Sequence, residues 1–529
     1  MQYTGNRKID RYYHSWRQLL NRFATSVGEA RITTLSTVLT GLLLLCVFAL
    51  FMGLVQFSTP DMPDNDGYYH IKLAYLMRSE GLKPAFPWLP LTILNPREFY
   101  DHHFLYHVLL IPFTFGDLRL GAKWAAVIFS SLAFLSVWRL FHNQRLLYAP
   151  LWAIGLLAVS EAFIYRMSIT RAQSLSLALL VVGVNWLLAG KHSRLLILGF
   201  VFVWFYNAFP LLLGIAGIYV LAVWLTERRL EIRPLLYSAA GIAAGLVINP
   251  YFPYNLTFAF QHILPKLLEP TSVSVGSEWY PYDTSQLLKN SSLALAAFIS
   301  GALALGLSGR RMDLRTAIGF CLACLFGLML FQSRRFIEYF PAFALIFAAF
   351  AWAPLIEDAA AKINIKGRRS PAGWIIRALP AFAVAVFLLP PIGSTFQASK
   401  ASLQSSKPYQ TYAGASAWLQ SNTPAGARVF QTDWDDFPRL FFYNTHNTYL
   451  VGLDPTYMQL YNGDLYDTWV DITQGKVENP SEVITTDFGA RYVLTDLLHT
   501  SFLSQARDDP RLVEVYRDTD AVVFQVIGP

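Results

Sequence analysis

The chain has 529 residues, of which 54% are hydrophobic, 15% aromatic and 15% charged. Because soluble domains typically carry about 25% charged residues, this composition excludes an ordinary soluble protein and favours a membrane protein. The formal net charge is +7, yet no basic surface interleaved with aromatic residues supports nucleic-acid binding. The N-terminal excess comprises Arg7, Lys8, Arg11, Arg17, Arg22 and Arg31, and such a basic segment is typical of the cytoplasmic side of a membrane.

Apolar stretches recur through the first three quarters of the chain, mostly close to the length of about 20 residues that spans a bilayer. We predict about eleven spans, or up to thirteen if the 195–226 region is divided differently. They lie near 36–57, 120–141, 147–165, 173–190, 195–209, 210–226, 235–250, 287–306, 316–332, 337–355 and 372–391. The first lacks a small-residue cleavage site, which indicates a retained span. The run at 104–115 is too short to span and is predicted to be interfacial or re-entrant.

The short connections at alternate ends of these spans are all basic. They lie at 142–145, 191–194, 226–233, 308–315 and 359–370. Under the positive-inside rule, these connections and the N-terminal segment 1–35 are cytoplasmic, and the membrane domain covers 36–394. Two long loops, 58–119 and 250–286, then face outward. We therefore expect a multi-pass protein of a bacterial or archaeal plasma membrane, with its C-terminus outside.

Residues 395–529 have the composition of a soluble domain. Strand-like runs alternate with helical patterns such as 412–420, which predicts a small periplasmic or extracellular α/β domain. The predicted strands are 427–432, 448–453, 490–496, 512–518 and 521–527. The cysteines, Cys46, Cys321 and Cys324, all lie in apolar segments. They are interpreted as packing residues, and no disulfide framework is predicted.

The first outward loop carries two polar patches. The first contains Asp61, Asp64 and Asp66, and the second contains Glu98, Asp101, His102, His103 and His107. The acidic residues of the first patch have three interpretations. They belong to a solvated loop, they cap the helix that begins near Gly67, or they bind a divalent cation or a proton. Two such patches in one loop favour a polar cavity at the membrane surface. The alternative is that His102 and His103 only cap and pack a re-entrant helix.

Four motifs, in this order, resemble those of the GT-C glycosyltransferases, and most closely the oligosaccharyltransferase catalytic subunits. They are NDGYYHIKLA after the first span, YDHHFLYHVLLIPF, TSVSVGSEW at 271–279 and SRRFIEYFPAFAL at 333–345. The plan of a hydrophobic domain followed by an α/β domain is similar as well. The resemblance implies transfer of a sugar or oligosaccharide from a polyprenyl-phosphate or polyprenyl-pyrophosphate donor to a protein, lipid or glycan acceptor outside the cytoplasm.

The resemblance also implies roles for individual residues. Asp66 falls on the first-loop Asp that binds metal and faces the acceptor, and Glu278 on the second-loop Glu that contacts metal or acceptor, so both are expected to be catalytic. Arg335 falls on the Arg that contacts the donor phosphates, where a permanent charge suits the task, and Arg334 is expected to assist it. Without the motif, the two arginines resemble an interfacial pair that reaches toward the lipid headgroups.

The sequence departs from the family at two places. Arg171 and Gln173 stand where a second acidic motif is expected. This departure has two interpretations. In the first, Mn²⁺ or Mg²⁺ is held by a different set of ligands, namely Asp66, Asp101, His102 and Glu278. In the second, Arg171 supplies part of the metal's charge near the donor phosphate.

The second departure concerns the acceptor. The family's WWDYG motif is represented only by DWDDF, so Trp434, Asp435 and Asp436 are candidate acceptor-binding residues, with a packing role for Trp434 equally open. Asp454 is predicted to be a turn residue.

The sequence is compatible with three classes of function. A GT-C glycosyltransferase leads, with either a sequon peptide or a lipid or polysaccharide as acceptor. A transporter or flippase is disfavoured, since ionisable residues gather at the ends of spans and no halves repeat. A non-catalytic scaffold of a cell-envelope complex is the third class.

Overall fold

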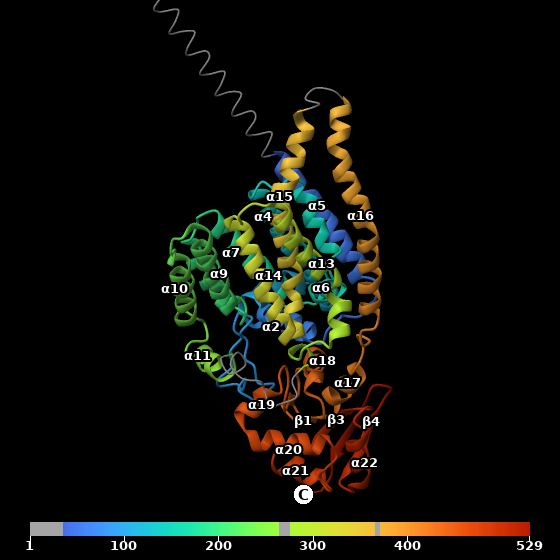
Figure 1. Ribbon diagram of the computed structural model, residues 1–529. Coiled ribbons are helices and arrows are strands. Elements are labelled where there is room, and N and C mark those ends of the chain that lie inside the picture. Colours follow the sequence, from blue (N-terminus) through green and yellow to red (C-terminus); the bar gives the residue numbers. More distant parts are fainter. Residues whose placement is uncertain (1–34, 264–275, 366–370, 529) are drawn as a thin grey trace, which may run out of the picture.

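The computed structural model describes residues 35–263, 276–365 and 371–528. The basic N-terminal segment and residues 271–275 of the second-loop motif lie outside this described part. Most of the chain is helical, and a small sheet forms near the C-terminus, at the opposite end of the molecule from the tips of α15 and α16 (Figure 1).

The membrane helices follow the predicted apolar stretches. After the helix Leu35–Gln56, the α-helices of this part are α2 (Asp66–Glu80), α3 (Phe104–Leu110), α4 (Leu118–Asn143), α5 (Ala149–Ile154), α6 (Glu161–Ser168), α7 (Gln173–Leu188), α8 (Arg194–Phe205), α9 (Pro210–Glu227), α10 (Arg233–Val247), α11 (Tyr254–Phe258), α13 (Thr284–Ser308), α14 (Leu314–Gln332), α15 (Phe340–Ile365) and α16 (Pro371–Gln404). Short 3₁₀ turns cover Ile111–Thr114, Gly155–Leu157, Ser277–Trp279 and Arg334–Glu338, and a π-helical turn covers Ala259–Ile263.

Within the described residues, seven helices are long and apolar enough to cross a membrane, or eight if the pair bent by 84° at 149–168 is one span. Three further predicted spans form helices Gln173–Leu188, Arg194–Phe205 and Arg233–Val247, which are shorter than a straight span requires. Because seven helices have the length and apolar composition of a membrane span, the chain is a multi-pass membrane protein. The run Phe104–Thr114 is also a short apolar helix.

The C-terminal region contains a five-stranded mixed sheet in the order β2-β1-β3-β5-β4. Its elements are α17 (Ala413–Asn422), β1 (Arg428–Gln431), a 3₁₀ turn (Trp434–Asp436), α18 (Phe437–Tyr443), β2 (Thr448–Tyr449), α19 (Thr456–Tyr461), α20 (Gly463–Thr473), α21 (Pro480–Thr486), β3 (Tyr492–Asp496), α22 (Thr500–Asp508), β4 (Leu512–Arg517) and β5 (Ala521–Val526). β1 pairs in parallel with β2 and β3, whereas β5 is antiparallel to β3 and β4. Each of the five predicted strand segments contains one of these strands.

The first outward loop joins the membrane helices to the α/β region. Trp88 donates its indole N–H to the carbonyl of Thr445 at 2.9 Å, and its own carbonyl accepts the N–H of Tyr449 at 2.8 Å. Tyr69, Phe86 and Trp88 are buried in the same apolar cluster as Phe437 and Phe441 of α18. The packing brings the N-terminus of α2 against the 3₁₀ turn that precedes α18, and a cavity opens at this junction.

Candidate active site

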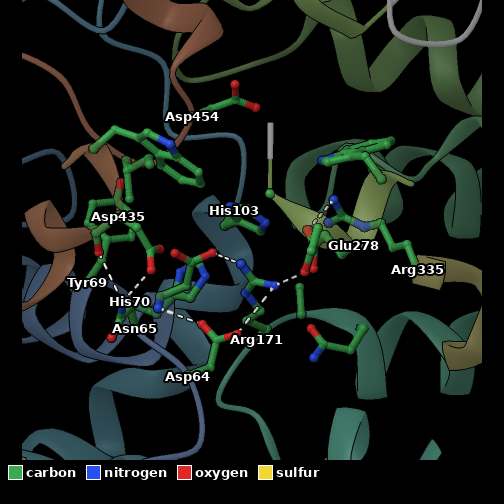
Figure 2. Close-up of a pocket in the computed structure, with 18 of the residues that line it drawn as sticks. Asp64, Asn65, Tyr69, His70, His103, Arg171, Glu278, Arg335, Asp435 and Asp454 are labelled. Carbon is green, nitrogen blue, oxygen red and sulfur yellow. Dashed lines mark hydrogen bonds and ion pairs between the residues drawn. The ribbon is translucent and has the colours of Figure 1, made fainter. Parts of the chain in front are cut away.

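A polar cavity of about 660 Å³ lies between the membrane helices and the α/β region. Its lining includes Asp66, Arg171, Glu278 and Arg335, which the sequence singled out, together with His102, Trp434 and Asp435. These side chains come from segments between residues 62 and 457 of the chain, and Figure 2 shows 18 of the lining residues, ten of them labelled. The sequence prediction of one cavity at the membrane surface is consistent with this arrangement.

Glu278 is the centre of a network of guanidinium groups. Its carboxylate contacts Arg166 at 2.9 Å, Arg171 at 3.0 Å and Arg335 at 3.1 Å. Although burial opposes ionisation, Arg335, Arg171 and Arg166 hold the pKa of Glu278 well below its ordinary value. Glu278 is therefore a permanent anion that gathers three cations at one wall of the cavity.

Arg171 bridges the two carboxylates that the resemblance identified. Its guanidinium pairs with Asp66. It also contacts Glu278 at 3.0 Å and lies 3.8 Å from Asp64 (Figure 2). The backbone N–H of Asp66 donates to Asp64 at 2.7 Å, which fixes the start of α2. The planar fork of an arginine suits such bridging, because it presents several donors at fixed angles.

Arg335 and Arg334 are adjacent in sequence but lie in different surroundings. Arg335 lines the cavity, donates to the hydroxyl of Tyr206 at 2.6 Å and stacks over Trp279 at 4.8 Å. Arg334 donates to the carbonyl of Pro281 at 3.1 Å and does not line the cavity. The 3₁₀ turn from Arg334 to Glu338 points the two side chains apart.

Two members of the network were not singled out by the sequence. Arg166 of α6 pairs with Glu278 and with Glu338, whose side chain is fully buried. Glu338 lies in the RFxxY stretch, one helical turn after Arg335. This spacing was the sequence feature that could have identified Glu338 as a member of the network. Gln173, by contrast, donates to the carbonyl of Arg166 at 2.9 Å and lines the cavity without a charge.

The four predicted metal ligands are not brought together. Asp101 is buried, accepts from His107 at 2.8 Å and from the N–H of His103 at 2.9 Å, and does not line the cavity. His102 lines the cavity but stacks on Phe258, with 5.1 Å between ring centroids. In the described part of the chain, no group of three or more His, Cys, Asp or Glu side chains is arranged to hold a metal ion. Arg171 stands between Asp66 and Glu278, so these two carboxylates already share a cation.

The α/β region closes the cavity with a second set of carboxylates. Asp435 accepts from the side chain of Asn65 at 2.7 Å, and Asn65 accepts from Arg439 at 2.7 Å. Burial, with the negative charges of Asp64 and Asp433, raises the pKa of Asp435 to about 7. Asn65 thus links the first loop to the DWDDF motif, a contact that no local sequence signal indicated.

The remaining residues of the DWDDF motif differ in placement. Trp434 lines the cavity and also packs partly against the core of the α/β region. Asp436 is 1% exposed and lies outside the cavity lining, because it points into the fold beside Tyr412. Asp454 accepts from the N–H of Thr456 at 3.0 Å, as a turn residue does, and also lines the cavity.

No protein-family model matches the sequence, and comparison with curated protein sequences gives no match. Solved structures do resemble the chain. An oligosaccharyltransferase of Archaeoglobus fulgidus has a TM-score of 0.62 at 15% identity, over 89% of this chain and 71% of that one. ArnT from Cupriavidus metallidurans, bound to undecaprenyl phosphate, has a TM-score of 0.53 at 13% identity, over 92% of this chain and 99% of that one.

A third similar structure is the arabinofuranosyltransferase AftD from Mycobacteria. Its TM-score is 0.54 at 14% identity, over 92% of this chain and 41% of that one. Identities this low establish a shared fold and no more. The predicted architecture is thereby confirmed: the chain has the fold of the GT-C glycosyltransferases, with a helical membrane part followed by a small α/β region.

Proposed function

We propose that this protein is a glycosyltransferase that moves a sugar from a polyprenyl-phosphate or polyprenyl-pyrophosphate donor to an acceptor at the outer face of the membrane. The observation that carries the proposal is the convergence of Arg171 and Arg335 with Asp66 and Glu278 on one cavity. Two of the similar structures support the ligand class. The ArnT structure contains undecaprenyl phosphate, and a structure of the archaeal enzyme contains a dolichol-phosphate and an inhibitory peptide.

The arginine network suits a leaving phosphate. When the bond between the sugar and the phosphate breaks, negative charge develops on the phosphate oxygens, and fixed cations in a buried site stabilise it most effectively. Arg335 and Arg171 are held at the cavity wall by Glu278, so little reorganisation is needed when this charge appears. Because the four-residue metal set is not assembled, we assign the neutralisation to these guanidinium groups.

The part of the cavity between Asp66 and the α/β region suits the acceptor. Asp66 lies at the start of α2, facing the motif that contains Trp434 and Asp435. We assign Asp66 to orientation of the acceptor's nucleophilic atom, and Trp434 and Asp435 to contact with the rest of the acceptor. Asp436 and Arg334 lie outside the cavity, and we assign them no direct contact.

The test is a transfer assay with the full chain in lipid nanodiscs. Undecaprenyl-phosphate and undecaprenyl-pyrophosphate sugars are offered with a sequon peptide, a glycolipid or an oligosaccharide, and labelled product is measured. We expect transfer to one acceptor class, lost in Asp66→Asn, and a glycopeptide only if the acceptor is a protein. Absence of both transfer and donor binding with every donor overturns the proposal and favours a transporter or a scaffold.

A further inference from the structure

A buried chain of hydrogen bonds leads from Asp101 to the cavity. Asp101 contacts Nδ1 of His107 at 2.8 Å, and Nε2 of His107 contacts Nδ1 of His70 at 2.7 Å. Asp101 is 2%, His107 0% and His70 3% exposed. Among the three, only His70 lines the cavity, which it enters from the first turns of α2.

The chain of contacts fixes the protons on both rings. An ionised carboxylate only accepts hydrogen bonds, so Nδ1 of His107 carries a proton that it donates to Asp101. Nε2 of a neutral His107 is then a lone pair, which must accept the proton on Nδ1 of His70. A neutral His70 with its proton on Nδ1 presents an unprotonated Nε2. Its ring is polar, almost wholly buried, and has its remaining nitrogen available to a ligand in the cavity.

We propose that His70 is the proton acceptor in the transfer reaction, and that His107 and Asp101 are positioning residues that keep its Nε2 unprotonated toward the cavity. This inference rests on the proposed function and adds a catalytic residue to it. The acceptor addressed by such a base carries a protonated nucleophile, a hydroxyl or an amine.

The step balances without an added reagent. The nucleophilic atom of the acceptor forms a bond to the anomeric carbon, and the bond from that carbon to the phosphate oxygen breaks. The electron pair leaves with the phosphate, which faces Arg171 and Arg335. The proton of the acceptor moves to Nε2 of His70.

The second histidine explains how a deeply buried imidazole can take up this proton. Burial, with the neighbouring His107 and His102, lowers the pKa of His70 well below its ordinary value. If His70 passes its Nδ1 proton to His107 as it gains one on Nε2, the positive charge comes to rest on His107. There it lies 2.8 Å from the carboxylate of Asp101, as a buried ion pair.

Other ionisable groups surround this pair of rings. His70 lies against His103 at 4.9 Å, His107 at 5.0 Å, Tyr106 at 5.3 Å and Tyr69 at 5.3 Å between ring centroids. His102 acts on it electrostatically. Asp101 is the carboxylate at the buried end of the chain Asp101–His107–His70, which we call the relay.

The kinetic test compares two nucleophiles with an undecaprenyl-phosphate sugar as donor. Water must lose a proton to attack, whereas azide carries none. We expect His70→Ala to slow release of free sugar about 10²-fold in kcat, and formation of the glycosyl azide by less than about threefold. His192→Ala is the matched control, since His192 is a part-buried histidine bonded to Tyr219 outside the cavity. Equal losses with both nucleophiles, or no loss with either, overturn the proposal.

The positioning role is tested by pH. In an Asp435→Asn background, which removes the cavity carboxylate whose pKa is about 7, the hydrolysis rate should fall as pH decreases and the relay becomes protonated. We expect Asp101→Asn to shift this midpoint to lower pH, because the protonated relay loses its counter-charge. A lower rate with an unchanged midpoint indicates packing alone and overturns the positioning role.

A readout independent of turnover uses ¹⁵N-histidine NMR of the full chain in nanodiscs, with His70→Gln identifying the signal. We expect a proton on Nδ1 and none on Nε2 of His70 at neutral pH. The opposite tautomer contradicts the relay. If no donor supports any reaction but this tautomer is found, the proposed function fails while the relay geometry stands.

Discussion

Two sets of carboxylates face the same cavity and differ in their partners. On the membrane side, Asp66 and Glu278 pair directly with guanidinium groups, and the pKa of Glu278 is well below its ordinary value. On the side of the α/β region, Asp435 accepts from the neutral amide of Asn65, and burial with nearby carboxylates raises its pKa to about 7. Among the described residues, no salt bridge joins a Lys or Arg to Asp435, on which Lys407 acts only at longer range, and its charge does not offset the effect of burial.

This difference shows that residue type alone does not set the chemistry of a carboxylate. Burial without a cation favours the protonated form, whereas burial among guanidinium groups favours the anion. We infer that the membrane side is built for a charged phosphate, and that the side of the α/β region is built for hydrogen bonding to an acceptor. Four predictions test this division.

The largest effect is expected for Arg171→Ala. The substitution removes the cation shared by Asp66 and Glu278, and loss of one member of a buried ion-pair network costs about 3 to 5 kcal/mol. We expect transfer to fall by at least about 10³-fold. Arg171→Lys keeps the charge but not the fork and should retain more activity. A thermal shift assay separates loss of fold from loss of turnover, and full activity in Arg171→Ala would contradict the division.

A loss of about 10²-fold in kcat is expected for Arg335→Ala, because Arg335 faces the proposed leaving phosphate. Its sequence neighbour supplies the matched control. Arg334→Ala removes the same side chain from outside the cavity and should change kcat by less than about threefold. Steady-state kinetics measure the loss of kcat in each variant. Equal losses would show that the position of an arginine inside or outside the cavity does not determine its effect on transfer.

Asp435→Asn should change the dependence of stability on pH. The folded pKa of about 7 exceeds the unfolded value of about 3.9, so the native state binds the proton more tightly. Stability from this group is therefore present at low pH and is lost as pH rises through about 7. We expect the Tm of the variant, relative to the parent protein, to rise by several degrees between about pH 5 and about pH 8. A difference that is constant with pH would show that Asp435 is ionised in both states.

The smallest effect is expected from chelation. Since Arg171 bridges Asp66 and Glu278, and Asp101 is turned toward His107, EDTA should change the transfer rate by less than about twofold. The assay is repeated with added Mn²⁺ and Mg²⁺. Loss of activity on chelation that Mn²⁺ restores would show that a metal displaces Arg171 and would return the first-loop carboxylates to the role of ligands.

The sequence by itself determined the large-scale plan. Apolar length and the change of composition near residue 395 predicted a helical membrane part followed by an α/β region, because hydrophobic length and strand alternation are local properties. Each predicted strand segment contains a strand of the sheet. The motifs also pointed to Asp66, Glu278, Arg171 and Arg335 as one site, and these four residues line the same cavity.

Only the tertiary structure decided which side chains share a partner. Arg334 and Arg335 are identical in type and adjacent, yet a 3₁₀ turn places one inside the cavity and the other outside it. Asp101 looked like a metal ligand in sequence, but the packing of α2 on α3 turns it toward His107 and His70. Contacts between residues far apart in the chain set burial and charge pairing, and these determine whether a polar residue binds, relays a proton or only packs.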